Sequence, residues 1–501
     1  MGRYHHAWGA RAMSFLNQNI LTWIVLSPFI AALLLIITPP NRGALIRWIA
    51  LLGAGLTLPL SILVAILYNR QQGGFQFQRD VPWINSLGIQ YHVGVDGISV
   101  VLVLLTAIII TAGVFASWRV QNRTKEFLAL LLFLVSGVFG VFVSLDLFFF
   151  FLFYEIAVLP MYLLIGIWGT GRKEYSAMKL TLYLLFGSAF ILVGILSLYF
   201  VSPQHTFDLL TLQRSGRFSY AFQRIIFLAF YIGFGILAGI WPLHTWSPDG
   251  HASAPTAVSM LHAGVLMKLG AYGILRVGVG LLPGGAHTWA FLMGAIATIN
   301  ILYGAFSAMG QTDFKYVVAY SSVSHMGVVM LGIASLNPVG VNGAVMQMFS
   351  HGIMTGLFFA VVGLVYEKSH TRDILKMGGF AKRMPGVAVA MTIGGLASFG
   401  LPATSGFIAE FMVFWGMWHT FPVLAALSVI GIVLTAVYVL RILQKIFLGP
   451  FTEQYHDLAD AQKTEWVAIT ALAALLILVG VMPSPLVNLI RLGLHGFHLN
   501  I

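Results

Sequence analysis

The chain has 501 residues, of which 59% are hydrophobic and only 9% are charged. Soluble domains carry about 25% charged residues, so this composition excludes an ordinary globular enzyme and indicates an integral membrane protein. The absence of cysteine excludes structural disulfides and cysteine-ligated iron–sulfur clusters. The net charge of +11 would suit nucleic-acid binding, but the basic residues lie between apolar runs, where membrane topology explains them better.

Apolar runs of about 20 residues recur along the chain, each long enough to cross the bilayer as a helix. No small-residue cleavage site follows the first run, so we expect a membrane helix there and not a signal peptide, whether translation starts at Met1 or Met13. The sequence predicts an all-α polytopic protein with about fourteen membrane helices, near residues 20–38, 44–68, 96–118, 127–145, 147–168, 176–201, 224–244, 255–280, 287–308, 316–335, 342–366, 386–414, 421–448 and 466–490.

The distribution of lysine and arginine predicts the orientation of these helices. Sixteen of the 27 basic residues follow odd-numbered spans, whereas nine lie in the termini and the even-numbered loops. Positively charged loops stay on the cytoplasmic side of the membrane. We therefore expect both termini on the outer side.

Two of the expected spans are interrupted by proline. The seventh carries Pro242 within residues 241–248, and the twelfth carries Pro402 within residues 400–406. Proline removes a helical hydrogen bond, and freed backbone at membrane depth is tolerated only inside protein or beside water. Both helices are therefore expected to be broken next to a polar interior.

The spacing of the two breaks favours an internal repeat. Five spans separate them, and an odd offset reverses the chain direction in the membrane, as in inverted-topology repeats. We expect a first repeat of helices 4–8 at residues 127–280 and a second of helices 9–13 at 281–448. Residues 1–126 would form the N-terminal tail and three helices, and 449–501 a loop and the last helix. Two ordinary kinked helices are the alternative.

Ionisable side chains also interrupt the apolar runs. A charged group at the bilayer centre costs roughly 2.5–3.5 kcal/mol on insertion scales, so residues retained there are functional by default. Acids, lysines and histidines at membrane depth are the groups from which proton relays are built. The residues of this predicted relay are Glu155, Lys179, Lys268, His325, His351 and Glu410.

The first two groups have open alternatives. Glu155 follows the phenylalanine run at 148–151, where an ionised carboxylate needs a cation nearby. It either belongs to a charge pair or is a structural carboxyl hydrogen-bonded to a neighbouring helix. Lys179, on the next span, either snorkels to the cytoplasmic interface or pairs with Glu155.

Lys268 lies near the middle of its span, too deep to snorkel easily, which favours a reversible proton carrier. His262, on the same span, is either a further relay group or a hydrogen-bonded packing residue. His325 and His351 lie on successive spans and favour a relay over a metal site, because no close histidine or carboxylate spacing accompanies them. Glu410 follows Pro402 by eight residues, about 12 Å along a helix, and is placed as an exit group.

Several motifs together resemble one known family. They are Gly94-Val95-Asp96-Gly97-Ile98-Ser99, Glu155 with Pro160-Met161-Tyr162, Pro242-Leu243-His244-Thr245-Trp246-Ser247-Pro248-Asp249, Ala254-Pro255-Thr256, Gln311-Thr312-Asp313-Phe314-Lys315, Tyr320-Ser321-Ser322-Val323-Ser324-His325-Met326-Gly327 and His370-Thr371-Arg372-Asp373. With these motifs the chain resembles the antiporter-like membrane subunits of respiratory complex I, NADH-quinone oxidoreductase. Within that family it is most similar to the group called subunit M (chain 4), because Glu410 stands where the L and N groups have lysine.

The resemblance implies fourteen core helices, inverted repeats and proton translocation driven by electron transfer from NADH to quinone. It places Glu155 as the fifth-helix glutamate, Lys268 as the eighth-helix lysine, His325 and His351 on the central axis, and Glu410 as the terminal glutamate. No flavin, nicotinamide, cluster or metal site is recognisable in the sequence. We therefore expect no cofactor in this chain, and L-, N-, K- and J-like partner subunits in a bacterial plasma membrane, with the redox arm contacted indirectly.

One position departs from the family pattern. Relatives carry a seventh-helix lysine five residues before the Pro-Leu-His motif and pair it with the fifth-helix glutamate, but this chain has Leu237 there. Glu155 then pairs with Lys179, His244 or Lys268, or the subunit conducts protons differently or not at all. One rival function is a multi-subunit cation/proton antiporter, whose large subunits resemble this chain. The other, motivated by Leu237, is a non-pumping structural paralogue.

Overall fold

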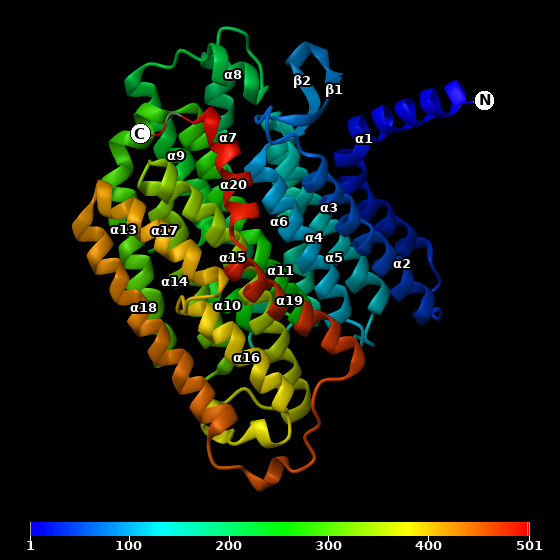
Figure 1. Cartoon of the computed structure of the whole chain (residues 1–501), viewed down its shortest axis with the longest axis vertical. Coiled ribbons are helices and arrows are strands. Elements are labelled where there is room, and N and C mark those ends of the chain that lie inside the picture. Colours follow the sequence, from blue (N-terminus) through cyan, green and yellow to red (C-terminus); the bar gives the residue numbers. More distant parts are fainter. Residues whose placement is uncertain (1, 498, 500–501) are drawn as a thin grey trace.

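The computed structural model describes residues 2–497 and residue 499, and this part of the chain is a helical bundle with one β-hairpin (Figure 1). The hairpin pairs β1 (Gln76–Ile84) with β2 (Ile89–Val95) antiparallel. The helices are α1 (Gly2–Ile37), α2 (Gly43–Gly55), α3 (Thr57–Leu67), α4 (Gly97–Ala116), α5 (Thr124–Val143), α6 (Leu147–Trp168), α7 (Lys173–Val201), α8 (Leu209–Ser215), α9 (Tyr220–Ala238), α10 (Trp246–Ser253), α11 (Thr256–Leu261), α12 (Met267–Gly273), α13 (Pro283–Gly310), α14 (Phe314–Ala334), α15 (Pro338–Ser369), α16 (Pro385–Ser398), α17 (Ser405–Thr420), α18 (Pro422–Ile442), α19 (Lys463–Val481) and α20 (Ser484–Gly493).

Thirteen helices in the described part are long and apolar enough to cross a membrane. This finding confirms the expected all-α polytopic membrane protein. The expected break in the span at 386–414 is present, since α16 and α17 cover that span as two helices, and the expected count of fourteen spans needs both to make one crossing. One expectation on span limits was wrong. The expected span 466–490 ends earlier, at Val481, because Pro483 precedes the separate helix α20.

Both breaks occur where proline predicted them. In the first, α9 ends at Ala238, Gly239 adopts a left-handed conformation with φ of 76°, and helix resumes at Trp246. In the second, α16 ends at Ser398 and α17 begins at Ser405, with a φ of 65° at Gly400 between them. A left-handed residue ends a helix, and glycine adopts that conformation without a Cβ penalty.

Asn300 of α13 satisfies the backbone freed by the first break. Its Oδ1 accepts a hydrogen bond of 2.6 Å from the Trp241 amide, and its Nδ2 donates to the carbonyls of Gly239 and, in α14, Val323. Asn300 is fully buried. The break is therefore held by a side chain that also contacts the neighbouring helix, in place of bulk water.

The centre of the bundle is the span formed by α11, α12 and two π-helical turns at His262–Leu266 and Ile274–Val279, together with α14 and α15. These helices are surrounded by protein on almost all sides, unlike the peripheral α7 and α18. Gly264 and Gly352 face each other, where a Cβ on either residue would lie within 3.3 Å of the other's carbonyl oxygen. Small residues thus allow the central span to lie directly against α15.

The hairpin, α8 and α20 lie at one end of the molecule (Figure 1). The parts of this end are joined by polar contacts. His92 of β2 and Asp208 before α8 are 2.6 Å apart, and Asp146 accepts a bond of 3.2 Å from the Gln90 amide. Asp146 also caps α6 through the amides of Phe148 and Phe149. Burial raises the pKa of Asp146 to about 6, although these hydrogen bonds act in the opposite direction.

Asp146→Asn keeps an oxygen that can cap α6 but cannot ionise. The pKa of this carboxyl is higher in the folded state than its unfolded value of about 3.9, so the folded protein binds more protons than the unfolded chain at pH values between the two. The free energy of unfolding therefore falls as pH rises from the unfolded pKa to the folded pKa. We expect the wild type to lose about 3 kcal/mol by this route between about pH 4 and pH 8, and Asp146→Asn to lose none of it. Thermal unfolding of the detergent-solubilised protein across this range measures the difference. Asp457→Asn, at a side chain that is 90% exposed, should keep the wild-type profile; an unchanged profile in Asp146→Asn would contradict the prediction.

Candidate proton-transfer site

Four of the residues predicted from the sequence form one continuous array in the centre of the bundle. The first contact joins Lys268 of α12 to His351 of α15, with 2.7 Å between Nζ and Nδ1. Both side chains are fully buried. The ammonium also donates to the carbonyl of Ala263, which belongs to the π-helical turn before α12. When Nδ1 accepts from Lys268, the ring carries its proton on Nε2, an atom with no protein partner in the described part of the chain.

The second contact joins the two histidines. The rings of His351 and His325 are stacked, with centroids 5.3 Å apart and planes 12° apart. His325 lies 2.8 Å through Nδ1 from the Ser321 carbonyl and 2.8 Å through Nε2 from the Ser398 carbonyl. A neutral ring can donate to only one of these carbonyls, whereas an imidazolium donates to both. Protonation of His325 is therefore matched by acceptors already in place.

The third contact reaches Glu410 of α17, whose Oε1 is 3.7 Å from Nε2 of His325. The carboxyl interacts with the Gln347 side chain, and its Oε2 has no protein partner among the residues described. The helix break makes room for it, because a Cβ at Gly400 would lie 2.7 Å from Oε2. Glu410 is 4% exposed and lines a largely apolar cavity of about 600 Å³ between α17 and α18.

Lys179 lies outside this array. Its Nζ is 2.8 Å from Oδ2 of Asp249 on α10, and the Tyr316 hydroxyl donates to Oδ1 of the same carboxylate at 2.9 Å. The sequence alternatives for Lys179 were a snorkelling position or a pair with Glu155, and neither named Asp249. The signal was present, since Asp249 ends the Pro-Leu-His motif that carries the first break.

Glu155 has no charged partner within 4.0 Å among the described residues. It is partly exposed on α6 and interacts with the Ser188 hydroxyl of α7. Leu237 is fully buried in α9. The structure thus does not bring Glu155 together with any of the three bases that the sequence offered as its partner.

A histidine pair lies between the Lys179 ion pair and the central array. The rings of His262 and His251 are 4.0 Å apart, and all four ring nitrogens lack protein partners in the described ranges. His251 was missed in the sequence, although it follows Asp249 by two residues. His244 is also buried without a partner for its ring nitrogens there, and its ring is 4.9 Å from that of Tyr303.

The described residues contain no group of three His, Asp or Glu side chains placed to hold one metal ion. What the geometry assembles is a row of groups that can each gain or lose a proton. The row runs from the fully buried amine of Lys268 through two imidazoles to a carboxyl beside a broken helix. Such an arrangement can pass protons, which needs no bound cofactor.

Comparisons with known proteins identify the family of this chain. The model of the family "NADH:quinone oxidoreductase/Mrp antiporter, TM" matches residues 144–435. NADH-quinone oxidoreductase subunit M of Rickettsia prowazekii is 37% identical over 487 residues, which cover 96% of this chain and 99% of the relative. The protein of the same name from Rhodobacter capsulatus is 36% identical, with 94% and 95% covered.

Two solved structures are similar in fold. A chain of respiratory complex I from Thermus thermophilus with bound NADH superposes with a TM-score of 0.87 at 30% identity, covering 94% of this chain and 98% of that one. A chain of the Mrp complex from Dietzia sp. gives a TM-score of 0.84 at 19% identity, over 95% and 97% of the two chains, which shows a shared fold alone. By sequence match over most of its length, the chain belongs to the family of antiporter-like membrane subunits of NADH:quinone oxidoreductase and Mrp antiporters.

Proposed function

We propose that this chain is the subunit-M-type proton-translocating membrane subunit of an NADH:quinone oxidoreductase. The names of its relatives support the assignment to that complex. The observation that carries the proton-translocating role is the contact series from Lys268 through His351 and His325 to Glu410. Ionisable groups inside a membrane protein are costly, so four of them in contact favour a proton-transfer role over a packing role.

Transfer along the array follows from the contacts. The Lys268 ammonium gives a proton to Nδ1 of His351, and the ring releases the proton on Nε2, so that one charge passes without rotation of the ring. The two histidine rings are stacked face to face and make no direct hydrogen bond, so the proposed transfer between them needs a bridging water. His325 then delivers it to Glu410, 3.7 Å away. Since neighbouring groups are coupled, protonation belongs to the array and not to single residues.

The Lys179–Asp249 ion pair is proposed as the input of the array, in place of the lysine that Leu237 replaces. Asp249 lies on α10, directly beyond the first helix break, and His251 and His262 lie between it and Lys268. Opening the ion pair would change the electrostatic potential at these histidines and hence the proton affinity of Lys268. Moving one charge against the membrane potential costs about 2.3 kcal/mol per 100 mV, a scale that rearrangement of a partly buried ion pair can reach.

The assignment to the complex carries further proposals. Redox chemistry belongs to partner subunits, and this chain has no redox centre of its own. Its membrane neighbours are L-, N-, K- and J-like subunits and lipid. The membrane is the bacterial plasma membrane, with both termini outside. Residues 127–280 and 281–448 are proposed as inverted repeats, and the two broken helices at corresponding places support this division.

One rival function has a specific observation in its favour. Leu237 and the unpaired Glu155 would both suit a structural subunit that holds other pumping subunits in place. The continuous array favours pumping, because a structural spacer needs no contacting titratable groups.

Lys268→Met removes the first group of the array while keeping the side-chain length. We expect NADH-driven proton pumping in membrane vesicles to fall by more than about tenfold, since a positioned proton-transfer group contributes about 10²–10⁴-fold. Lys376→Met, at a loop side chain that is 70% exposed, is the matched control and should pump normally. Full pumping by Lys268→Met would favour the structural role, and pumping that requires sodium would favour a cation antiporter.

Lys179→Met should leave Asp249 without its cation and lower NADH-driven pumping by about tenfold or more. If Lys179 replaces the missing family lysine, a lysine at position 237 should restore part of the activity. The double variant Lys179→Met/Leu237→Lys is therefore expected to pump faster than Lys179→Met alone. Pumping rates of the three assembled complexes measure this, and wild-type pumping by Lys179→Met would remove the ion pair from the mechanism.

A further inference from the structure

A second polar group lies on the central span, toward the end of the molecule that carries the hairpin. Arg276 donates to Oδ2 of Asp96 at 2.6 Å, and the two side chains are only 5% and 3% exposed. Nε of Arg276 also donates to the Tyr272 hydroxyl at 3.3 Å. That hydroxyl is 2.9 Å from Oγ of Ser99 and donates to the Phe142 carbonyl at 3.3 Å.

This group opens onto a polar cavity. Asp96 and Arg276 line a cavity of about 360 Å³, together with Gln72, Gln78 and Arg214. A single water takes about 30 Å³ of liquid, so the cavity can hold several waters. Its walls come from the hairpin and the turn before it, from α8, and from the end of α20 with the residues after it, which lie together at the same end in Figure 1.

The group continues the line of Lys268 along one helix face. Lys268, Tyr272 and Arg276 follow one another at intervals of four residues, which places them on one side of the span about 6 Å apart along its axis. Lys268 is the first group of the transfer array. Tyr272 is therefore one helical turn beyond that array, in the direction of the polar cavity.

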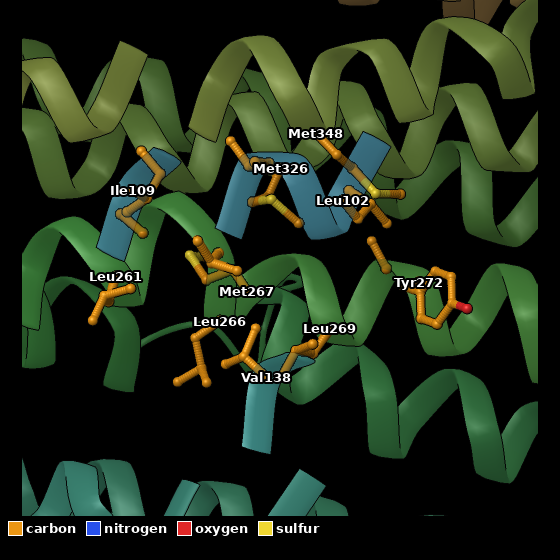
Figure 2. Close-up of a cluster of buried hydrophobic side chains, with 14 of the residues drawn as sticks. Leu102, Ile109, Val138, Leu261, Leu266, Met267, Leu269, Tyr272, Met326 and Met348 are labelled. Atoms are coloured by element: carbon orange, nitrogen blue, oxygen red, sulfur yellow. The ribbon is translucent and has the colours of Figure 1, made fainter. Parts of the chain in front are cut away.

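A dry layer separates the two levels. Leu105 of α4 packs beside the transfer array, because a Cβ added to Gly352, the neighbour of His351, would lie 2.7 Å from the Leu105 side chain. One turn further lie Leu102 of α4 and Met348 of α15, both fully buried, and another turn along α4 lies Ser99, the partner of Tyr272. Figure 2 shows Leu102 and Met348 in one apolar cluster beside the Tyr272 ring, whose hydroxyl points away from the cluster.

We propose that Tyr272, Ser99 and Asp96 form a second proton outlet from Lys268, closed in this structure by Leu102 and Met348. This inference rests on the proposed function of Lys268. When the layer admits water, a proton from the Lys268 ammonium reaches the Tyr272 oxygen as that hydroxyl turns from the Phe142 carbonyl and gives its own proton to Oγ of Ser99. The Ser99 hydroxyl gives up its proton in turn, and water in the cavity carries it to the Asp96 carboxylate. Asp96 then releases a proton to the cavity, and Arg276 keeps its charge throughout.

A purely structural ion pair would explain Asp96 and Arg276 but not the rest of the group. Asp96 caps α4 through the Ser99 amide, and an ion pair at this depth would serve to fasten the helix to the central span. The hydroxyls of Tyr272 and Ser99 extend the polar contacts from the ion pair toward the apolar layer, where fastening needs none. Their position one turn from Lys268 is what the outlet requires.

Met348→Asn places a polar amide in the dry layer and tests the outlet without enzyme turnover. The assembled complex is studied in sealed vesicles, where an imposed pH gradient decays in the absence of NADH and an entrapped pH-sensitive dye reports the decay. We expect Met348→Asn to leak protons about tenfold faster than wild type, equivalent to a barrier lowered by about 1.4 kcal/mol. Leu102→Asn should leak in the same way and serves if Met348→Asn fails to assemble. Met260→Asn, a fully buried exchange in α11, should remain tight.

The route of the leak is tested by a second change. Met348→Asn/Tyr272→Phe should return to the wild-type rate, because the phenyl ring keeps the packing but cannot pass a proton. Met348→Asn/Tyr231→Phe is the matched control, since Tyr231 is a buried tyrosine on α9, and it should leak as fast as Met348→Asn. Tight vesicles in both layer variants would overturn the outlet, as would a leak that Tyr272→Phe does not reduce. The outlet is tested by passive proton leak without NADH, whereas the proposed function is tested by NADH-driven pumping of Lys268→Met. Failure of the outlet and failure of the proposed function are therefore distinguishable.

Discussion

The contact between the Lys268 ammonium and the His351 imidazole is the interaction on which the central structure depends. A buried amine needs acceptors, and Lys268 finds one on its own span and one on a helix that approaches closely. The facing glycines Gly264 and Gly352 permit that approach, and the π-helical turn before α12 supplies the Ala263 carbonyl. The Lys268–His351 contact therefore depends both on the close packing of the two helices and on the π-helical turn.

The remaining sites are arranged around this contact. Toward α17 the array ends at Glu410, where the left-handed Gly400 leaves space for the carboxyl. Toward α7 it is separated from the Lys179–Asp249 pair by two histidines in van der Waals range. Toward the hairpin it meets a dry layer one helical turn thick. The surroundings of the array therefore differ in the three directions, with a carboxyl beside an apolar cavity, an ion pair behind two histidines, and an apolar layer.

Much of this arrangement follows from the sequence, for identifiable reasons. Long apolar runs predict the membrane helices, and Pro242 and Pro402 predict the breaks, because both signals act locally. The buried amine and imidazoles of the array were found because such groups are rare in apolar runs. The partners Asp249 and His251 were missed because they lie in a short polar helix, where acids and histidines are ordinary. Pairing between distant helices depends on tertiary packing, so spacing could not identify the Lys179–Asp249 pair, and it left both alternatives for Glu155 open.

Asn300 has a mechanical consequence for the two halves of the bundle. The buried Asn300 side chain bonds the Trp241 amide and the Gly239 carbonyl, both at the start of the interruption of the seventh span, and also the Val323 carbonyl, two residues before His325. Displacement of the interrupted segment would strain the 2.6 Å hydrogen bond between the Trp241 amide and Asn300. The strain would reach the backbone next to His325 without any transfer of charge. The Asn300 hydrogen bonds thus link the interrupted segment to α14 directly, beside the electrostatic coupling through the charged groups. A movement of the interrupted segment would affect His325 through both.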